Sequence, residues 1–557
     1  MNPHLPPLVR TAAAIALLVS LAPSPGIAAK KDSNAARPSI VLILTDDQRA
    51  DTMFAMPIVQ ERLAARGVSF TNAFVTNPTC CPSRASILTG QYSHSTGVYN
   101  NGGPNGGFGT FDDDSTIATR LSPKYKTGLF GKYLNGYGPA ANSGFIPPGW
   151  DRWVSFHRAA YHNYSLNIDG QSRRYGNDPG DYSTAVLAGH AESFIRNTNG
   201  PLFVYFSPVA PHKPTTPAQQ DAGAFAGLPP HRPPSYNEAD LSDKPVWARE
   251  RPLNRPQISS TDRFRKDQLR TLVAVDRAVG RIVDALAATG RLKNTLIVFT
   301  SDNGMMWGEH GQRGKGIGYE ESIHVPMIVR YDPLTNASED SHVVGNIDLA
   351  PTMADVAGIP MPGAEGRSLV PLLKGDGSGW RSALLLEHLA QKKGSPPTFC
   401  GVRAERLKLI AYDHGRNELY DLAADPFELD NLIKVPAMRD QIVSLRDRLE
   451  KLCSPPPPGT PRRFPTVKLP QRPTETASDT GNGPNPGTSP EQPAAPVKIN
   501  TRLPGRVNSG GVGKIPPGVM LLRSAVKAFM KPWPSTGDSS WLSWSFGVLN
   551  SLTRSMV

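Results

Sequence analysis

Oxygen-bearing side chains follow two apolar stretches of the sequence that are predicted to be buried strands. Asp46 and Asp47 come directly after the run at residues 39–45. A later apolar run is followed by Asp302 and Asn303. Carboxylate and amide oxygens are the donors that Ca²⁺ and Mg²⁺ prefer, although each residue alone would more often belong to a turn or cap. Together they predict a divalent-cation site, and the lack of a dense His/Cys set argues against a zinc pair.

A cysteine-containing segment at residues 79–90 reads as a loop that turns into a helix. Pro82 suits the first helical position, which places Cys80 just ahead of the helix N-terminus. Unpaired N–H groups and the macrodipole favour an anion there, and Arg84 adds a positive charge about one turn later. We therefore expect the Cys80 thiol to have a lowered pKa and to be reactive. The alternative is a buried, inert cysteine, since free cysteine is among the most buried residue types.

The elements that must position these residues alternate between apolar strands and helices. This pattern predicts an α/β fold with a mostly parallel central sheet that is covered on both faces. Open sheets of this kind bind ligands at the carboxyl ends of their strands, where the predicted cation ligands lie. The expected strands are residues 39–45, 68–75, 127–135, 202–206, 296–299 and 325–329, and the expected helices are residues 56–65 and 270–288, with residues 215–257 mostly irregular.

The texture of the sequence changes after about residue 376. Shorter predicted strands (384–387, 400–412 and 418–422) and an amphipathic helix at 436–452 indicate a smaller α+β subdomain. Cys400 and Cys453 remain once the two cysteines of the helix segment are set aside, and we predict that they pair, with two free thiols as the alternative. The predicted divisions are a catalytic domain at 38–376, a C-terminal subdomain at 377–454 and a tail at 455–557.

The N-terminal residues 1–29 are predicted to be a signal peptide. Arg10 precedes an apolar run at residues 11–22, and small residues at Ala28 and Ala29 suit cleavage. The run is shorter than the roughly 20 residues that a membrane span needs, although a retained anchor is the alternative. The prediction places the protein outside the cytoplasm, as a secreted, periplasmic or cell-surface protein.

The C-terminal tail carries most of the positive charge. From residue 454 onward there are twelve basic residues against four acidic ones, so this segment holds +8 of the formal net charge of +12. The charge therefore does not indicate a nucleic-acid-binding face on the folded part. It favours contact between the tail and anionic polymers or a membrane surface, or it simply keeps a Pro-rich, largely disordered tail soluble. Residues 519–530 form a candidate amphipathic helix, and residues 541–549 are apolar.

The helix segment resembles the signature of the type I, formylglycine-dependent sulfatases. The matching residues are Cys80, Pro82, Ser83 and Arg84, followed by Leu88-Thr89-Gly90, and the resemblance covers roughly residues 38–453. It implies an alkaline-phosphatase-like fold and conversion of Cys80 to formylglycine, because Pro82 lies two residues after the modified position. A formylglycine-generating enzyme is then an implied partner.

The resemblance also implies a set of site residues. It assigns one divalent cation, usually Ca²⁺ with Mg²⁺ as an alternative, to Asp46, Asp47, residue 80, Asp302 and Asn303. The matching cationic and histidine positions are Arg84, Lys132, His212, His310 and Lys315. Many members have Trp-His after the lysine that matches Lys132, whereas this chain has Tyr133-Leu134-Asn135. That form is similar to the glucosamine-6-sulfatase and heparan endosulfatase branch.

The chemistry implied by the resemblance needs several cooperating groups. A sulfate ester repels anionic nucleophiles, so a cation and the side chains of Arg84, Lys132 and Lys315 are expected around it. The hydrated aldehyde at residue 80 offers one hydroxyl to attack and a second to release the sulfate. Asp46, Asp47 or the metal would activate it. His212 or Lys315 would protonate the leaving oxygen, with His310 as a candidate partner.

These considerations predict a sulfatase that acts on a sulfate monoester, aryl or carbohydrate, of which an N-acetylglucosamine-6-sulfate type is one candidate. One alternative is a formylglycine-dependent phosphonate or phosphodiester hydrolase. Another is an inactive binding protein for sulfated polymers. His94 is expected to have a structural role.

Overall fold

The computed structural model describes residues 37–249, 252–391, 396–461 and 464–471. In this part of the chain the main sheet has ten strands in the order β13-β2-β12-β9-β1-β8-β4-β5-β6-β7. The five neighbours from β9 to β5 are mutually parallel. Their bounds are β9 Thr295–Ser301, β1 Ser39–Thr45, β8 Leu202–Ser207, β4 Lys126–Gly131 and β5 Arg152–Phe156.

Antiparallel strands extend both sides of this parallel centre. On one side β12 runs antiparallel to both β9 and β2, and β13 pairs parallel with β2; on the other side β6 and β7 form an antiparallel extension of β5. The α/β fold is confirmed, and the sheet is mixed because its margins are antiparallel. The bounds are β2 Val68–Phe70, β6 Ser165–Ile168, β7 Gln171–Arg174, β12 Met327–Arg330 and β13 Ser338–Asp340.

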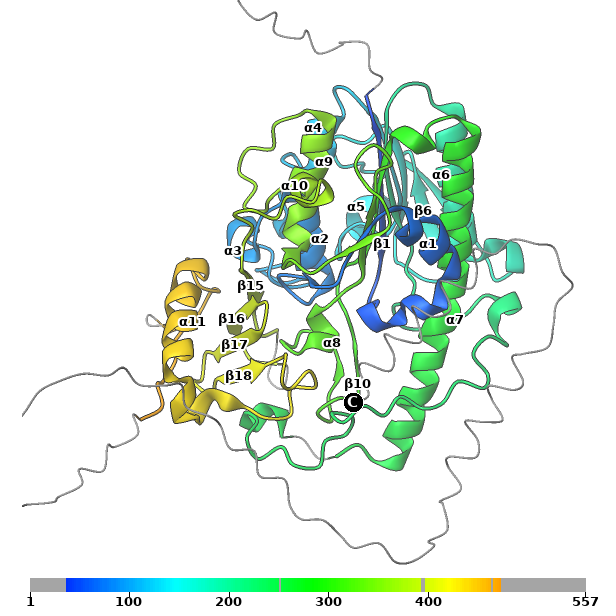
Figure 1. The fold of residues 1–557 in the computed structure, drawn as a ribbon. Helices are drawn as coiled ribbons and strands as arrows, with labels where there is room; N and C mark the ends of the chain where they lie inside the picture. The colour runs from blue at the N-terminus through cyan, green and yellow to red at the C-terminus, as the bar shows by residue number, and fades with distance from the viewer. Residues whose placement is uncertain (1–36, 250–251, 392–395, 462–463, 472–557) are drawn as a thin grey trace, which may run out of the picture. The chain divides into compact units, whose positions relative to one another are not determined.

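Helices cover both faces of the sheet (Figure 1). Ile40, Leu42 and Leu44 of β1 pack into one apolar core and Val41 and Ile43 into the other, because successive strand residues point to opposite faces. All seven residues of β1 are buried, as the continuous apolar run predicted. The first core lies under α2 Cys80–Thr89, α4 Ile117–Leu121 and α9 Leu349–Ala357, and the second under α1 Pro57–Arg62, α6 Ser183–Asn197 and α7 Arg255–Ala288.

Helix α7 is longer than predicted. It spans 34 residues from Arg255, whereas the sequence pattern indicated a start at residue 270. Asn254 caps the helix through its side chain, and Gln257 completes a reciprocal capping box. The apolar spacing is weak before residue 268, so periodicity missed the first turns although the capping residues mark them. The predicted strand 68–75 is interrupted and forms β2 and β3.

The C-terminal part of the fold is a four-stranded antiparallel sheet with one helix. Its elements are β15 Ala383–His388, β16 Phe399–Ala404, β17 Leu407–Tyr412, β18 Glu418–Asp421 and α11 Arg439–Leu452. Phe464 and Val467 are buried in the core of this sheet, so packed structure continues past the predicted division at residue 455. The shorter elements are β3 Ala73–Phe74, α3 Ser93–Thr96, α5 Gly138–Asn142, β10 Met306–Trp307, β11 Arg313–Gly314, α8 Glu320–Ile323, β14 Val344–Gly345 and α10 Val370–Leu373.

A disulfide joins Cys400 of β16 to Cys453 at the end of α11, 53 residues apart. We expect the variant with serine at both positions to lose about 3–4 kcal/mol of unfolding free energy, because the cross-link limits the entropy of a long loop in the unfolded chain. Urea unfolding of the parent and the double variant measures the difference. Reductant should bring the parent to the stability of the variant. Equal stabilities without reductant would contradict the prediction.

Two predicted segments fall largely outside the described residues. These are the signal peptide at residues 1–29 and the tail beyond residue 471. Within the described ranges, none of the helices has the length and apolar character needed to cross a membrane.

Candidate active site

The predicted cation ligands meet at the ends of two adjacent parallel strands. β1 and β9 pair in register up to Thr45 and Ser301, so the residues that follow emerge side by side. The Asp302 N–H donates to the Thr45 carbonyl at 3.1 Å, and the Asp47 N–H donates to Asp302 Oδ1 at 3.1 Å. Asn303 Nδ2 donates to Asp47 Oδ1 at 2.6 Å. Asp47 has φ 71°, a left-handed conformation that Asp tolerates better than most residues.

The donor set of this cluster fits a hard divalent cation. One atom each from Asp46, Asp47, Asp302 and Cys80 lies within 4.8 Å of all the others. Asp47 Oδ2 and Asn303 Oδ1 are buried without a hydrogen-bond partner among the described residues. Buried oxygens without a partner are costly, and an ion that prefers oxygen ligands would satisfy both. These residues could therefore hold Ca²⁺ or Mg²⁺.

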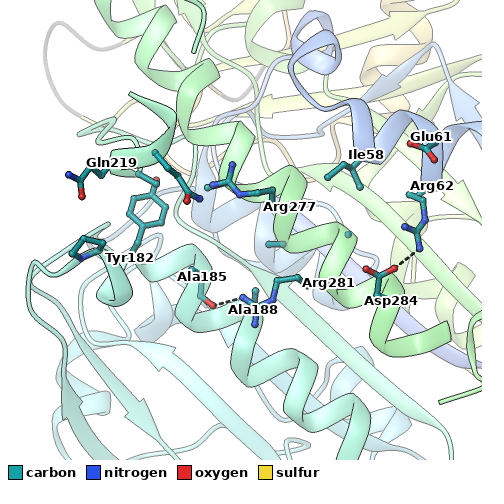
Figure 2. A pocket seen from close by; sticks show the side chains of 16 residues that line it. Ile58, Glu61, Arg62, Tyr182, Ala185, Ala188, Gln219, Arg277, Arg281 and Asp284 are labelled. Carbon is teal, nitrogen blue, oxygen red and sulfur yellow. Dashed lines mark hydrogen bonds and ion pairs between the residues drawn. The ribbon is translucent and has the colours of Figure 1, made fainter. Parts of the chain in front are cut away.

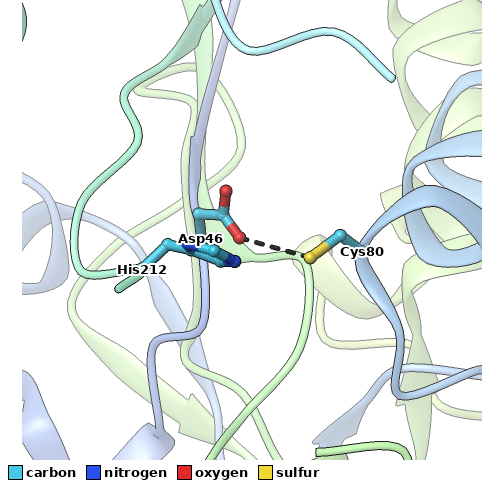
Figure 3. A group of neighbouring side chains, drawn as sticks. All are labelled: Asp46, Cys80 and His212. Carbon is cyan, nitrogen blue, oxygen red and sulfur yellow. Dashed lines mark hydrogen bonds between the residues drawn. The ribbon is translucent and has the colours of Figure 1, made fainter. Parts of the chain in front are cut away.

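Cys80 lies at the centre of the cluster, but its helix does not begin as predicted. α2 starts at Cys80 itself, so Pro82 is its third residue. The Cys80 thiol donates to Asp46 Oδ1 at 3.4 Å, and Lys315 Nζ donates to Cys80 Sγ at 2.6 Å. Figure 3 shows the Cys80 side chain pointing toward Asp46, with His212 next to them.

The prediction of an acidified thiol is wrong. Complete burial, followed by the nearby carboxylate of Asp46, raises the pKa of Cys80 to about 12 against the opposing charges of Lys132 and Lys315. Helix position alone could not reveal this, because burial and the carboxylate both come from tertiary packing. The thiolate form of Cys80 is therefore disfavoured in the cluster as it stands without a cation.

Cationic side chains surround the same carboxylates. Lys132 Nζ lies 2.5 Å from Asp46 Oδ2, and Lys315 Nζ contacts Asp47 Oδ1. Burial would raise the pKa of Asp46, but these charges, with Lys132 the largest, hold it well below its usual value. Lys132 follows Gly131, which has φ 130° and where a Cβ would lie 1.8 Å from a carbonyl of β8. Glycine is therefore needed at position 131, the end of β4, directly before Lys132.

Arg84 is fully buried beneath the cluster. Its Nε donates to Asp302 Oδ2 at 2.7 Å, and its Nη2 lies 3.6 Å from Asp46 Oδ2. Its Nη1 donates to the carbonyl of Lys132 and to Ser207 Oγ, both at 2.8 Å. Sequence reasoning missed Ser207, although it is a polar residue at the end of an apolar strand and the rule used for Asp46 could have found it. Arg84 therefore ties together the ends of α2, β4, β8 and β9.

The two predicted histidines have different surroundings. His212 follows β8, and its Nε2 lies 3.8 Å from Asp47 Oδ2, with about a quarter of the side chain exposed. The Tyr161 hydroxyl donates to the His212 carbonyl at 2.7 Å and fixes this loop. His310 Nδ1 instead lies 2.6 Å from Glu238 Oε2, and its ring packs on Tyr319. The structure thus brings His212 to the cluster and places His310 in a different buried network.

His94 links the segment after α2 to the C-terminal sheet. Its Nδ1 lies 2.9 Å from Glu387 Oε2 of β15, and its Nε2 lies 3.5 Å from Glu365 Oε1. Burial lowers the pKa of His94, but the two carboxylates raise it on balance to about 9. The charged imidazole of His94 thus pairs with both carboxylates and fixes the segment that follows α2.

We expect His94→Gln to lower the unfolding free energy by about 1.5–3 kcal/mol below pH 6.5, the value expected for a hydrogen bond to a charged group. The folded pKa of His94, about 9, exceeds its ordinary value of 6.5, so its contribution is full below pH 6.5 and is lost as the pH rises through 9. Denaturant unfolding across this range measures the difference. His342→Gln, at a half-exposed histidine, is the control. A deficit that grows with pH would contradict the prediction.

Comparison with known proteins identifies the family. Residues 38–359 match the Sulfatase family model. The chain belongs to the sulfatase family. Residues 308–454 match a second model of these enzymes, described as the C-terminal region of N-sulphoglucosamine sulphohydrolase. The resemblance found in the sequence is therefore confirmed.

Individual relatives are similar over much of the chain. The extracellular sulfatase SULF-1 homolog of Drosophila melanogaster is 35% identical over 65% of this chain, which covers 34% of that protein. The N-acetylglucosamine-6-sulfatase of Capra hircus is 31% identical over 77% of this chain and 86% of that protein. The chain thus spans about a third of the fly protein's length and most of the goat protein's.

Solved structures support the alkaline-phosphatase-like fold. One is a complex with its substrate D-glucosamine-2-N,6-O-disulfate, with a TM-score of 0.68 and 26% identity over 75% of this chain and 98% of that one. The phosphonate monoester hydrolase of Agrobacterium radiobacter has a TM-score of 0.61 and 23% identity over 75% of this chain and 96% of that one. At that identity the second likeness shows the fold alone.

Proposed function

We propose that this protein is an exported sulfatase that hydrolyses sulfate esters of glucosamine-type carbohydrates, with Cys80 converted to formylglycine and one divalent cation bound beside it. Ca²⁺ is the favoured ion and Mg²⁺ the alternative. The observation that carries the proposal is the position of the residue-80 side chain, between the carboxylate of Asp46 and the ammonium group of Lys315. The goat relative, an N-acetylglucosamine-6-sulfatase, and the solved complex with a glucosamine disulfate support the substrate class, and the extracellular relatives support export.

The groups around residue 80 have separate roles in the proposed reaction. Formylglycine, once formed, supplies a hydrated aldehyde with one hydroxyl for attack on sulfur and another for product release. A divalent cation held by Asp46, Asp47, Asp302, Asn303 and residue 80 would supply positive charge that offsets the charge of the sulfate group. Lys132 and Lys315 are placed to bind those oxygens, and losing one such preorganised donor typically costs about 2.7–4 kcal/mol. His212, partly exposed at the edge of the cluster, is placed to give a proton to the leaving oxygen.

Substrate turnover tests this proposal against the alternative phosphonate or phosphodiester activity. The protein is made together with a formylglycine-generating enzyme, and the mass of the residue-80 peptide is checked for the aldehyde. We expect sulfate release from N-acetylglucosamine-6-sulfate, and faster cleavage of an aryl sulfate than of the matched aryl phosphodiester. Faster diester cleavage, or no sulfate release from protein that carries the aldehyde, would overturn the proposal.

Charge balance in the cluster predicts that cation and anion bind together. The carboxylates of Asp46, Asp47 and Asp302 face the cations Arg84, Lys132 and Lys315. A divalent cation alone adds unbalanced charge to this buried group, and an anion offsets it. We therefore expect inorganic sulfate to tighten Ca²⁺ binding by about tenfold, a coupling of ~1.4 kcal/mol.

Calorimetric titration of Ca²⁺ with and without sulfate measures this coupling, and equal chloride at matched ionic strength is the control. The same factor should appear when sulfate is titrated with and without Ca²⁺, because coupling between sites is reciprocal. Ca²⁺ binding that sulfate leaves unchanged or weakens would contradict the prediction.

A further inference from the structure

A second pocket lies between the C-terminal sheet and the segment that precedes α7. Its volume is about 510 Å³, and it shares no lining residue with the Asp46–Cys80 cluster. We call it the basic pocket, because four exposed cationic side chains line it. They are Arg249, Arg416, Lys434 and Lys468.

The cations of the basic pocket are not neutralised. Among the described residues, the side chains of Arg416, Lys434 and Lys468 have no hydrogen bond or ion pair. Arg249 donates to the backbone carbonyls of Lys244 and Ser242, which carry no charge. The positive charge of the rim is therefore available to a ligand.

The carboxylate in the pocket lining is already engaged. Both oxygens of Asp243 accept from Lys244 Nζ at 3.1 Å, and Oδ2 also accepts from the Asn431 N–H at 2.6 Å. Lys244 is fully buried, and Glu238 lies 3.6 Å from its ammonium group. Lys244 thus offsets part of the negative charge of Asp243 and Glu238, and the positive charge at the pocket mouth comes from the four rim cations.

The wall of the pocket is held in place by specific contacts. Asn417 Nδ2 donates to the Thr466 carbonyl at 2.7 Å, and Arg439 Nη1 donates to the Pro470 carbonyl. Val467 is buried in the core of the C-terminal sheet. These anchors lie on both sides of Lys468, so this lysine stands on a fixed segment and loses less freedom when it binds an anion.

A larger groove in the described structure has cations that are paired with carboxylates. It lies between α1, α6 and α7, has a volume of about 730 Å³ and also contains arginines (Figure 2). Arg62 pairs with Asp284, Arg277 pairs with Asp221, and Arg281 pairs with Glu192. The size of a groove and its arginine content are thus not sufficient to make it a site for an anionic ligand. The basic pocket differs because its cations lack carboxylate partners.

We infer that the basic pocket binds a sulfated polysaccharide at anionic groups other than the one being hydrolysed. Several separate cations around one hollow suit a chain that carries repeated sulfate groups better than they suit a single small anion, because each contact contributes little alone. This inference rests on the proposed function for the class of polymer. The pocket then serves as a second contact for a long substrate.

Binding of a heparin-derived octasaccharide tests the inference in the full-length protein. All proteins carry Cys80→Ala, so the probe is not consumed. The pocket variant carries Arg416→Ala, Lys434→Ala and Lys468→Ala. The control variant removes three exposed cations elsewhere, through Lys124→Ala, Arg158→Ala and Arg174→Ala.

We expect the pocket variant to bind the octasaccharide about tenfold more weakly than the parent, and the control variant less than about twofold, at low ionic strength. With a chemically desulfated octasaccharide, the difference in affinity between the pocket variant and the control variant should disappear. Equal losses in both triple variants would reveal only an overall charge effect and overturn the inference. So would unchanged binding by the pocket variant, or a difference that persists with the desulfated probe.

Two further measurements keep this test interpretable. Arg416→Ala alone, in an exposed turn, gives a smaller loss of the same kind if the triple variant fails to fold. Sulfate release from N-acetylglucosamine-6-sulfate by the parent with residue 80 intact is measured separately. Absence of sulfate release would contradict the proposed function, whereas the binding comparison tests the role of the basic pocket.

Discussion

Replacing Cys80 by serine or alanine is expected to lower kcat by a factor on the order of 10⁵–10⁶, the loss seen when a covalent nucleophile is removed. Alanine leaves no atom between Asp46 and Lys315, where Sγ now lies. Serine restores an oxygen there, but while that alcohol is not oxidised it has no aldehyde and lacks the second hydroxyl that releases the product. Turnover of N-acetylglucosamine-6-sulfate measures the effect, with the mass of the residue-80 peptide recorded for each protein.

The neighbouring Cys81 provides a matched control. Both cysteines are free and buried, and burial raises the pKa of Cys81 to about 11. Their surroundings differ, because Cys81 packs in the apolar core beneath the sheet. We expect Cys81→Ser to change kcat by less than about tenfold. A similar loss in both variants would mean that the integrity of α2 is being measured. Full turnover by Cys80→Ser protein whose residue-80 peptide carries no aldehyde would exclude a formylglycine nucleophile at residue 80.

The positions of the proposed cation ligands could be predicted because they follow from local order in the chain. A fully apolar run must be buried, parallel buried strands end at one edge, and the residue after each run therefore lies at that edge. This reasoning predicted the meeting of Asp47 with Asp302 and Asn303. It could also have predicted Ser207, which the expected strand end at residue 206 left out.

The properties of side chains were harder to predict than their positions. The helix start favoured an acidic thiol at Cys80, but burial and Asp46 reverse the shift of its pKa. His310 was predicted as a candidate partner of the proton donor, yet its Nδ1 lies 2.6 Å from Glu238 Oε2. Both outcomes depend on residues far away in sequence, which local patterns do not specify.

The basic pocket could not be predicted for the same reason. Its cations come from Arg249, Arg416, Lys434 and Lys468, which are separated by long stretches of chain. The sequence directed attention to the tail instead, since most of the net charge lies there. A count of charges along the chain does not reveal which of them lack a carboxylate partner in the folded protein.

Arg84→Ala is expected to lower the unfolding free energy by about 3–5 kcal/mol when measured in the presence of a chelator. The substitution removes the ion pair to Asp302 at 2.7 Å and leaves that carboxylate buried without its cationic partner. It also removes the hydrogen bonds to the Lys132 carbonyl and to Ser207. Urea denaturation of parent and variant measures the loss.

The pH dependence and a surface control distinguish this mechanism from simple loss of packing. Burial raises the pKa of Asp302, and without Arg84 it should rise further. The folded variant then takes up a proton as the pH falls, so its deficit should shrink at acidic pH. Arg62→Ala removes an equally short pair, to Asp284, in which both side chains are accessible to solvent, and should cost less than about 1 kcal/mol. Equal losses at both arginines, or a deficit at Arg84 that does not change with pH, would show that buried charge is not what the arginine offsets.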